Sequence, residues 1–272
     1  MTLLEVRNVT KRYGGNAAVD DVSFGIDEGE AVGLIGSNGA GKTTLFKMIA
    51  GELAMTSGTI TFDGRQMTSG RRQLADLTRR PEAGLQRLPS RPDGRARLGI
   101  ARTFQLVEMF GGLTVLDHVL VSLQAHTGRQ GPLRDLSGHG GTTDEEAARC
   151  EATIELCGLA GLGRAPVEAL SLGQRRAVEL ARALVAVPRI LLADEPSSGL
   201  DTHEAGELAA VIRRVRAETR LAVLLVEHDL ATVEAVAERV IAMDAGRVIS
   251  AGTFDEVLHD PLVVASWLGK PA

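Results

Sequence analysis

Aromatic side chains are scarce in this chain of 272 residues, where they make up 3% of the sequence and include one Trp and one Tyr. An RNA-binding sheet or a base-stacking platform needs rows of aromatic side chains, so both are excluded. The hydrophobic share of 44% is nevertheless typical of a globular protein, so aliphatic residues must fill the core. The length suits one large α/β domain or two smaller lobes.

Cysteine is also scarce, with two residues, and long apolar runs and an excess of positive charge are missing. Cys150 and Cys157 are seven residues apart in a helical pattern, which separates them by about 10 Å along the axis and predicts free thiols. No segment approaches about 18 uninterrupted apolar residues, and the N-terminus lacks a signal-peptide pattern, so we expect neither a membrane span nor export. With 30 basic and 35 acidic residues, the net charge of −5 gives no general attraction to nucleic acid.

Short apolar runs that alternate with helical patterns predict a parallel sheet buried on both faces. The clearest strands are expected at Ala31–Ile35, Ile190–Ala193 and Leu221–Val226. The intervals 3–26 and 58–64 instead predict shorter, antiparallel strands separated by turn residues. We therefore expect an α/β fold with one mixed sheet.

Two segments break this alternation. Residues 65–102 hold ten Arg, three acidic residues and three Pro with little apolar periodicity, which predicts an exposed insertion. Such an insertion is either a solvated loop without a partner or a docking site for acidic lipid headgroups or for an acidic loop of a partner protein. Residues 115–167 are helical in pattern except for a Gly-rich loop at 128–141, which predicts a helical lobe inserted into the sheet domain.

The sequence GSNGAGKT follows the first buried strand and precedes an apolar helical pattern, as a P-loop does. Its glycines let backbone N–H groups turn toward phosphate oxygens, and the helix N-terminus adds its positive dipole end. Lys42 is expected to reach the β and γ phosphates of a nucleotide, and the Thr43 hydroxyl to bind magnesium. The residues predicted to bind the nucleotide are Gly36, Ser37, Asn38, Gly39, Ala40, Gly41, Lys42, Thr43 and Thr44.

A second apolar strand, ILLADE at 190–195, ends in two carboxylates. Two adjacent acidic residues at the end of a buried strand are hard to explain by packing. We expect Asp194 to hold the magnesium ion, and Glu195 to orient or deprotonate the attacking water.

These motifs occur in an order that resembles the ATPase subunit of ABC transporters. The order is Tyr13, GSNGAGKT, Gln105, LSLGQ at 170–174, ILLADE, SGLD at 198–201 and His228. The most specific element is LSLGQRR at 170–176, which other P-loop families lack. Four further strings resemble the ATPases of branched-chain amino acid importers, and the lipopolysaccharide-export ATPase shares most of them. They are GIARTFQ at 99–105, LTVLDHV at 113–119, EHD at 227–229 and DPLVVASWLG at 260–269.

The resemblance implies a role for each matching residue. Tyr13 would stack on adenine, Gln105 would contact magnesium and link the two lobes, and His228 would contact the γ-phosphate and hold Glu195 in place. In this family two ATPase subunits face each other head to tail, and the signature motif of each caps the ATP of its partner. The residues assigned to that cap and to the dimer seam are Ser171, Gly173, Gln174 and Asp201.

The residues of the signature motif also carry a prediction of their own. Ser171 is a good N-cap for the helical pattern that follows it, in which Val178, Ala181 and Leu184 share one face with Val185. Leu172 stands where the commonest family pattern has Gly, so we expect less tight closure over ATP rather than loss of function.

The implied fold is a P-loop NTPase (RecA-like) ABC ATPase core with an antiparallel β portion and an inserted helical subdomain. Residues 1–272 would form one ABC ATPase domain. Its core lobe would comprise 1–105 and 168–250, with a basic insertion at 65–98, a helical subdomain at 106–167 and a C-terminal helical tail at 251–272. The implied cofactors are ATP and Mg²⁺.

The implied partners are a second ABC ATPase subunit, identical or different, and integral membrane permease subunits, with a solute-binding protein acting indirectly and no nucleic acid. The implied location is cytoplasmic, peripheral on the inner face of the cell membrane. Import of branched-chain or related amino acids is the implied function. Lipopolysaccharide or lipid export, and a soluble nucleotide-gated clamp in DNA repair or translation, are the alternatives. One ATPase half and no long coiled coil speak against the clamp.

Overall fold

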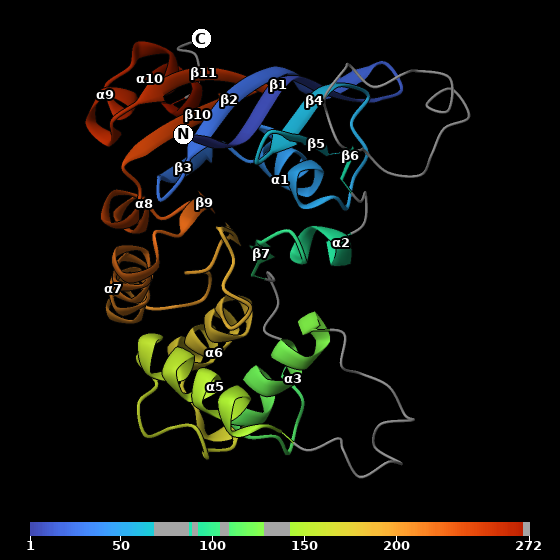
Figure 1. Cartoon of the computed structure of the whole chain (residues 1–272). Helices are drawn as coiled ribbons and strands as arrows, with labels where there is room; N and C mark the ends of the chain where they lie inside the picture. The colour runs from blue at the N-terminus through green and yellow to red at the C-terminus, as the bar shows by residue number, and fades with distance from the viewer. Residues whose placement is uncertain (68–86, 89–91, 104–108, 128–141, 269–272) are drawn as a thin grey trace.

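The computed structural model describes residues 1–67, 87–88, 92–103, 109–127 and 142–268. Its strands form two separate sheets, so the antiparallel portion that we expected is a sheet of its own and does not belong to the mixed sheet. Apolar alternation shows which strands are buried, but it does not show which of them share hydrogen bonds. Figure 1 shows the antiparallel sheet above and the helical lobe below, with the central strands of the second sheet between them.

The first sheet is built mainly from antiparallel strands. Its order is β2 (Asn16–Asp27), β1 (Thr2–Tyr13), β4 (Ser57–Phe62), β5 (Arg65–Met67) and β6 (Arg87–Leu88), and β5 pairs with β6 in parallel. β1 and β2 have 12 residues each and are longer than expected. Shifts of register between them allow such long strands to bend and twist.

The second sheet holds the strands that the sequence predicted as parallel. Its order is β11 (Arg247–Gly252), β10 (Arg239–Asp244), β3 (Ala31–Gly36), β9 (Ala222–Val226), β8 (Ile190–Asp194) and β7 (Ile100–Arg102). All these strands are parallel except β11, which is antiparallel to β10. Every residue of β3, β8 and β9 is buried, which explains their uninterrupted apolar sequences.

Helix α1 (Lys42–Ala50) fills the space between the two sheets. Its apolar face packs in one core with side chains of both sheets, including Leu45 and Phe46 of α1, Leu4 of β1, and Leu34 of β3. This packing fixes the start of α1 directly after β3, where the P-loop lies.

The opposite face of the parallel sheet is covered by helices. α6 (Leu172–Leu184) and α7 (Thr202–Thr219) pack in one core with this face, and α3 (Val115–Thr127) and α5 (Asp144–Leu156) join that core by packing against α6. The predicted apolar face of α6 is confirmed, because Val178, Ala181, Leu184 and Val185 are all buried. α6 packs against both α3 and α5, so its core is continuous with that of the predicted helical subdomain.

The remaining described elements are short. They are α2 (Pro92–Ala96), a 3-10 turn at Val167–Ala169, α8 (Leu230–Val236), α9 (Phe254–Leu258) and α10 (Pro261–Leu268). α8, α9 and α10 form a third small core with β3 and β10.

Within the described part of the chain, no helix has the length and apolar character needed to cross a membrane. Cys150 and Cys157 are buried free thiols as predicted, and burial raises the pKa of Cys157 to about 12.

The prediction that residues 65–102 form an exposed insertion is wrong at both ends of that stretch. Residues 65–67 are β5, and 92–102 contain α2 and β7. Arg95 is only 1% exposed, and its guanidinium donates to the carbonyls of Met48 (2.9 Å) and Ile49 at the end of α1. Burial lowers the pKa of Arg95 to about 10. Periodicity could not reveal this arginine as a helix cap, and residues 68–86 and 89–91 lie outside the described residues.

Candidate functional site

Three neighbouring strands of the parallel sheet end at the same edge. β3 leads into the P-loop, β8 ends at Asp194, and β9 is followed by Glu227. The register aligns Asp194 and Leu34 with the same residue of β9, Val226. In parallel sheets, ligands bind at the carboxyl ends of the strands, so this edge is the candidate site.

The P-loop is so close to neighbouring segments that two of its positions have no room for a side chain. Gly36 and Gly41 have φ angles of 147° and 100°. A Cβ atom at Gly36 would collide with the carbonyl oxygen of Met243, and one at Gly41 with that of Ala18. Gly41 is the N-cap of α1 and provides no side-chain cap, so the first amides of α1 remain available to an anion.

Lys42 lies inside this loop. Its side chain is 5% exposed, and Nζ donates to the carbonyls of Gly36 (2.7 Å) and Ser37 (3.1 Å). Burial lowers the pKa of Lys42, while the carboxylates of Glu195 and Asp194 oppose that shift. The effect of burial on the ammonium is thus larger than the attraction of the two carboxylates. A negatively charged ligand at the loop would stabilise the ammonium further.

The other predicted loop residues differ in exposure. Asn38 and Gly39 are exposed, Ala40 is buried, and its N–H donates to the carbonyl of Ser37 (3.1 Å). Thr43 is exposed and Thr44 is half-buried in the first turn of α1. An exposed hydroxyl at this place is available as a ligand for a cation.

Asp194 is a buried carboxylate at the end of β8. It is 1% exposed, and neither of its oxygens has a hydrogen-bond partner among the described residues. Burial raises its pKa, and Arg102, whose Nη2 lies 3.7 Å from Oδ2, opposes this rise. Because a buried carboxylate needs compensation and its oxygens are the donors that Mg²⁺ prefers, the residues here fit a magnesium ion.

Glu195 and His228 form a pair at the same edge. His228 Nε2 lies 3.0 Å from Glu195 Oε1. Glu195 has a φ of 49°, a conformation that costs energy for a residue with a side chain, and its N–H donates to the carbonyl of Val226 (2.8 Å). The backbone is thus held so that the carboxylate turns away from the strand toward His228.

Glu227 is a site residue that we did not predict beyond its place in the EHD string. It is 3% exposed and accepts from the N–H (2.8 Å) and hydroxyl (2.7 Å) of Ser197 and from the N–H of His228 (3.0 Å). It therefore ties the loop after β8 to the loop after β9. A carboxylate directly after a wholly apolar strand was the signal that could have found it.

A cavity of about 250 Å³ opens at this edge. It is lined by Ile35, Gly36, Ser37, Glu227, His228, Leu230 and Trp267. Trp267 belongs to α10 and is the single Trp of the chain. The C-terminal helix therefore reaches the site, which the sequence did not indicate.

The signature residues lie at a different place, the N-terminus of α6. Ser171 is its N-cap as predicted, accepting from the N–H of Gln174 (3.2 Å), while the Gln174 side chain accepts from the N–H of Ser171 (3.0 Å). The N–H of Gly173 donates to Glu204 (3.2 Å), and Leu172 is partly exposed. None of these residues lines the described cavity beside the P-loop.

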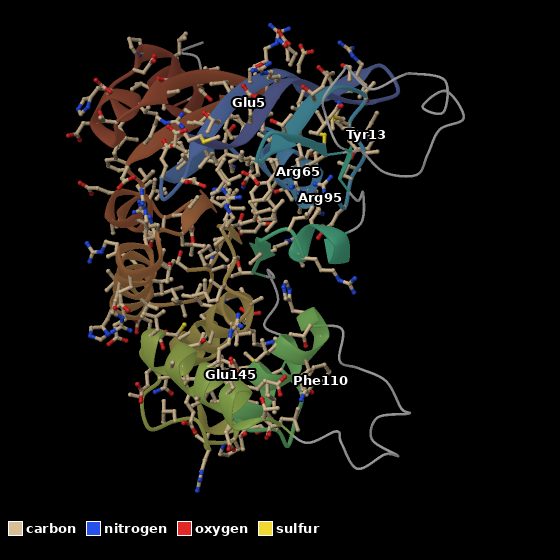
Figure 2. The ribbon with its side chains drawn as sticks, in the orientation of Figure 1. Glu5, Tyr13, Arg65, Arg95, Phe110 and Glu145 are labelled. Atoms are coloured by element: carbon tan, nitrogen blue, oxygen red, sulfur yellow. The ribbon has the colours of Figure 1, made fainter. Side chains whose placement is uncertain are left out.

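Two of the three remaining predicted residues are exposed. Asp201 is exposed and caps α7 by accepting from the N–H of Glu204 (2.8 Å). Tyr13 is 55% exposed at the end of β1, with Lys11 Nζ 5.0 Å from the centre of its ring (Figure 2). The ring is thus free to stack. Gln105 lies outside the described residues.

Comparison with known proteins agrees with these motifs. The family model described as ABC transporter matches residues 19–198, which is more than half of the chain. The chain is 34% identical over 270 residues to the high-affinity branched-chain amino acid transport ATP-binding protein LivG of Salmonella typhimurium, covering 98% of both chains. It is 32% identical over 274 residues to the corresponding protein BraF of Pseudomonas aeruginosa, again covering 98% of both.

Solved structures give the same result for the fold. The ADP conformation of an ATP-binding cassette from an ABC transporter matches with a TM-score of 0.79 and 27% identity, covering 99% of this chain and 100% of the other. A dimeric post-hydrolysis cassette bound to ADP and phosphate matches with a TM-score of 0.69 and 25% identity, covering 93% and 99%. With its P-loop, its buried strand-end carboxylate and its α6 signature motif, the chain belongs to the ABC transporter family and has that family's P-loop ATPase fold.

Proposed function

We propose that this chain binds and hydrolyses ATP as the motor subunit of an ABC importer for branched-chain or related amino acids. The proposal of ATP hydrolysis is supported by the groups that lie together at one edge of the parallel sheet. That edge combines a backbone anion cradle with Lys42, the buried carboxylate of Asp194 and the Glu195–His228 pair. The substrate class rests on LivG and BraF, whose names state branched-chain amino acid transport.

Each group then has a defined task. The amides at the start of α1 and the Lys42 ammonium bind the phosphates, and Tyr13 stacks on the adenine. Thr43, Asp194 and Gln105 would hold magnesium, which when bound neutralises charge on the phosphate oxygens. Glu195 accepts the proton of the attacking water, and His228 keeps the Glu195 carboxylate oriented through the 3.0 Å contact.

The site is completed by a second ATPase subunit, either another copy of this chain or a related one. The N-terminus of α6, with Ser171 and an exposed Leu172, is built as a helix start but is not part of the cavity beside its own P-loop. In a head-to-tail dimer it would face the γ-phosphate bound by the partner, with Asp201 at the seam. A solved relative in the family is described as dimeric, which supports this arrangement.

Mixing two defective chains tests the shared site. Ser171→Arg and Lys42→Ala chains should each be inactive alone. When a dimer contains one of each, one composite site carries both defects and the other carries none, so each mixed dimer should hydrolyse ATP at about half of the parent's rate. Random pairing at an equal ratio makes about half of the dimers mixed, so the sample should reach about a quarter of the parent's rate. Phosphate release against mixing ratio measures this.

A matching binding experiment separates the two defects. Calorimetry should show that the Ser171→Arg monomer binds ATP as the parent does, because its own P-loop is unchanged. The shared-site proposal is refuted if Ser171→Arg weakens ATP binding by the monomer as strongly as Lys42→Ala does.

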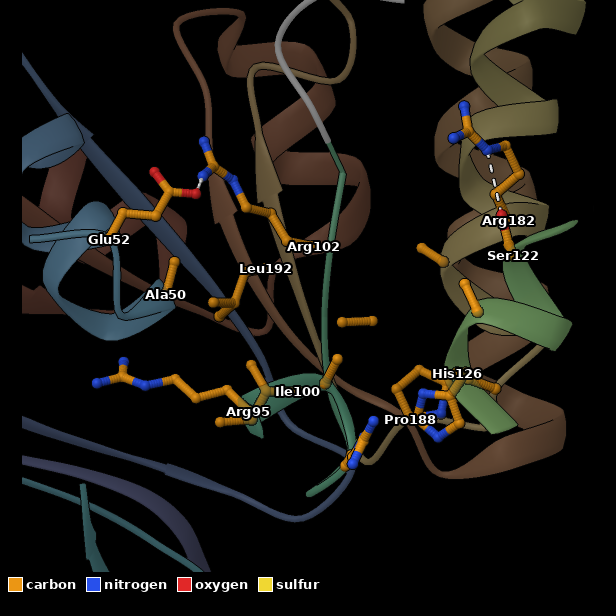
Figure 3. A pocket seen from close by; sticks show the side chains of 16 residues that line it. Ala50, Glu52, Arg95, Ile100, Arg102, Ser122, His126, Arg182, Pro188 and Leu192 are labelled. Carbon is orange, nitrogen blue, oxygen red and sulfur yellow. Dashed lines mark hydrogen bonds and ion pairs between the residues drawn. The ribbon is translucent and has the colours of Figure 1, made fainter. Parts of the chain in front are cut away.

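A groove between the two lobes is the proposed contact with the permease. It has a volume of about 490 Å³ and is bounded by β7 and α2 on one side and by α3 and α6 on the other (Figure 3). Apolar side chains such as Ile100, Pro188 and Leu192 line it, together with Arg97, which is exposed. This lining suits an apolar helical turn that carries a carboxylate. The chain would thus lie peripherally on the inner face of the membrane.

Reversing one charge tests the groove. Arg97→Glu should reduce the amount of permease that copurifies with the chain from solubilised membranes, and should reduce cellular uptake of labelled leucine, because the groove would repel the acidic turn. ATP affinity should not change. Arg213→Glu changes another exposed arginine, on α7, and is the matched control. Equal losses in both variants would contradict the assignment of this groove.

A further inference from the structure

Three of the N–H groups that begin α6 already have partners within this chain. The Ser171 hydroxyl accepts from the N–H of Gln174 (3.2 Å), and the Gln174 side chain accepts from the N–H of Ser171 (3.0 Å). The N–H of Gly173 donates to Oε1 of Glu204 (3.2 Å), which belongs to the neighbouring helix α7. A helix start offers only about four such N–H groups, so an incoming anion competes with partners that are already in place.

Glu204 differs from the other two partners in charge and in origin. Ser171 and Gln174 are neutral and belong to the start of α6, and a serine hydroxyl can also donate to a phosphate. Glu204 comes from α7, and an ionised carboxylate only accepts, so it would repel a γ-phosphate at the amide that it occupies. It also packs closely there, because a Cβ atom at Gly173 would lie 3.2 Å from Oε1 and 3.3 Å from Cβ of Glu204. Phosphate and Glu204 therefore exclude each other at the N–H of Gly173.

The carboxylate of Glu204 has a second position available on its own helix. Glu204 is the third residue of α7, and its N–H donates to the side chain of Asp201, the N-cap (2.8 Å). In a capping box, the side chain at this third position accepts in return from the N–H of the N-cap residue. Helices α5, α6 and α9 each form both of these hydrogen bonds. In α7 the Glu204 side chain bonds Gly173 instead, so turning back to the N–H of Asp201 would complete the capping box and free Gly173.

We propose that Glu204 is an autoinhibitory residue, which occupies the Gly173 amide and leaves it for the N–H of Asp201 when the γ-phosphate of the partner's ATP binds to Gly173. This inference rests on the proposed function, because it takes the start of α6 as the cap on the partner's ATP. Each closed dimer of this chain would then have to release two such carboxylates, one from each copy. Glu204 does not line the described cavity beside the chain's own P-loop, so binding of ATP to a monomer should not depend on it.

The test measures the ATP concentration at which half of the chains form dimers, using analytical ultracentrifugation with Mg²⁺ and Glu195→Gln chains, so that no ATP is consumed. Glu204→Ala removes the charge and the hydrogen bond together. It should lower this concentration by about fivefold, since the net contribution of one hydrogen bond changes an equilibrium by about that factor. Glu204→Gln keeps an acceptor for Gly173 without the charge, so it should lower the concentration by a smaller factor, and it serves as the second variant if Glu204→Ala folds poorly.

Two other carboxylates serve as matched controls. Glu256 has the same position in α9, where its side chain accepts from the N–H of Thr253 (2.8 Å). Glu256→Ala should lower the melting temperature without changing the ATP concentration for dimerisation. Glu207 lies on α7 as Glu204 does and is largely exposed, so Glu207→Ala should change neither. The ATP affinity of the monomer, measured by calorimetry in Ser171→Arg chains, should not respond to Glu204→Ala.

The inference is overturned if Glu204→Ala and Glu204→Gln leave the ATP concentration for dimerisation unchanged, or if they raise it. Weaker ATP binding by the monomer after Glu204→Ala would also overturn it, because Glu204 would then act at the P-loop of its own chain. All these results leave the proposed function standing. Chains that stay monomeric at saturating MgATP, both with Glu204 and with Glu204→Ala, would instead refute the shared site, and the inference with it.

Discussion

Replacing Glu195 with Gln should abolish ATP turnover while ATP binding stays close to that of the parent. The carboxylate is proposed as the base for the attacking water, and a positioned general base contributes about 100- to 10,000-fold to a rate. The amide keeps the size of the side chain and its contact with His228, 3.0 Å away, but it cannot accept the proton. Phosphate release and calorimetry with MgATP measure the two effects separately.

The chain supplies a matched control for this substitution. Glu207 on α7 also pairs with a histidine, His203, at 3.8 Å, but both side chains are largely exposed. Glu207→Gln should hydrolyse ATP as the parent does. A Glu195→Gln chain that retains turnover near the parent's rate would show that Glu195 is not the base.

Replacing Lys42 with Ala should weaken ATP binding as well as turnover. The ammonium is proposed to face the β and γ phosphates in the ground state and in the transition state, so both measurements lose the same contact. Hydrogen bonds to charged groups contribute about 1.5–3 kcal/mol, which predicts a loss of affinity of at least about tenfold. Calorimetric titration with MgATP measures this loss.

Lys47, which lies on the same helix and is exposed, provides the comparison. Lys47→Ala should change ATP affinity far less than Lys42→Ala, although both variants remove one positive charge from α1. Unchanged affinity in the Lys42→Ala chain would contradict the assignment of the P-loop itself.

Much of the fold was predictable because its central strands are buried on both faces. The runs at β3, β8 and β9 contain almost nothing but aliphatic residues, and such runs can be recognised locally. The division into two sheets was not predictable, because it depends on α1 being inserted between them. The burial of Arg95 was missed for the same reason, since its partners lie more than 40 residues away at the end of α1.

The candidate site, too, was predictable mainly where the signal is local in the sequence. The P-loop, Asp194 and Glu195 were found because each motif combines a strand with chemistry at its end. Arg102 and Trp267 were not, because their importance comes from contacts between strands and helices that are distant in sequence. Glu227 directly follows β9, so its position carried the same local signal, and it was missed all the same. Roles assigned to Gln105 and Tyr13 rest on the resemblance to the family.

Native mass spectrometry of the complex, purified from solubilised membranes with the Glu195→Gln chain and MgATP, tests the central claim most directly. One spectrum counts the ATPase chains, the nucleotides and the membrane subunits in the same particle. The proposed function predicts two ATPase subunits that hold two ATP molecules, together with permease subunits. A particle with a single ATPase chain, or one whose two chains carry no ATP, would contradict it.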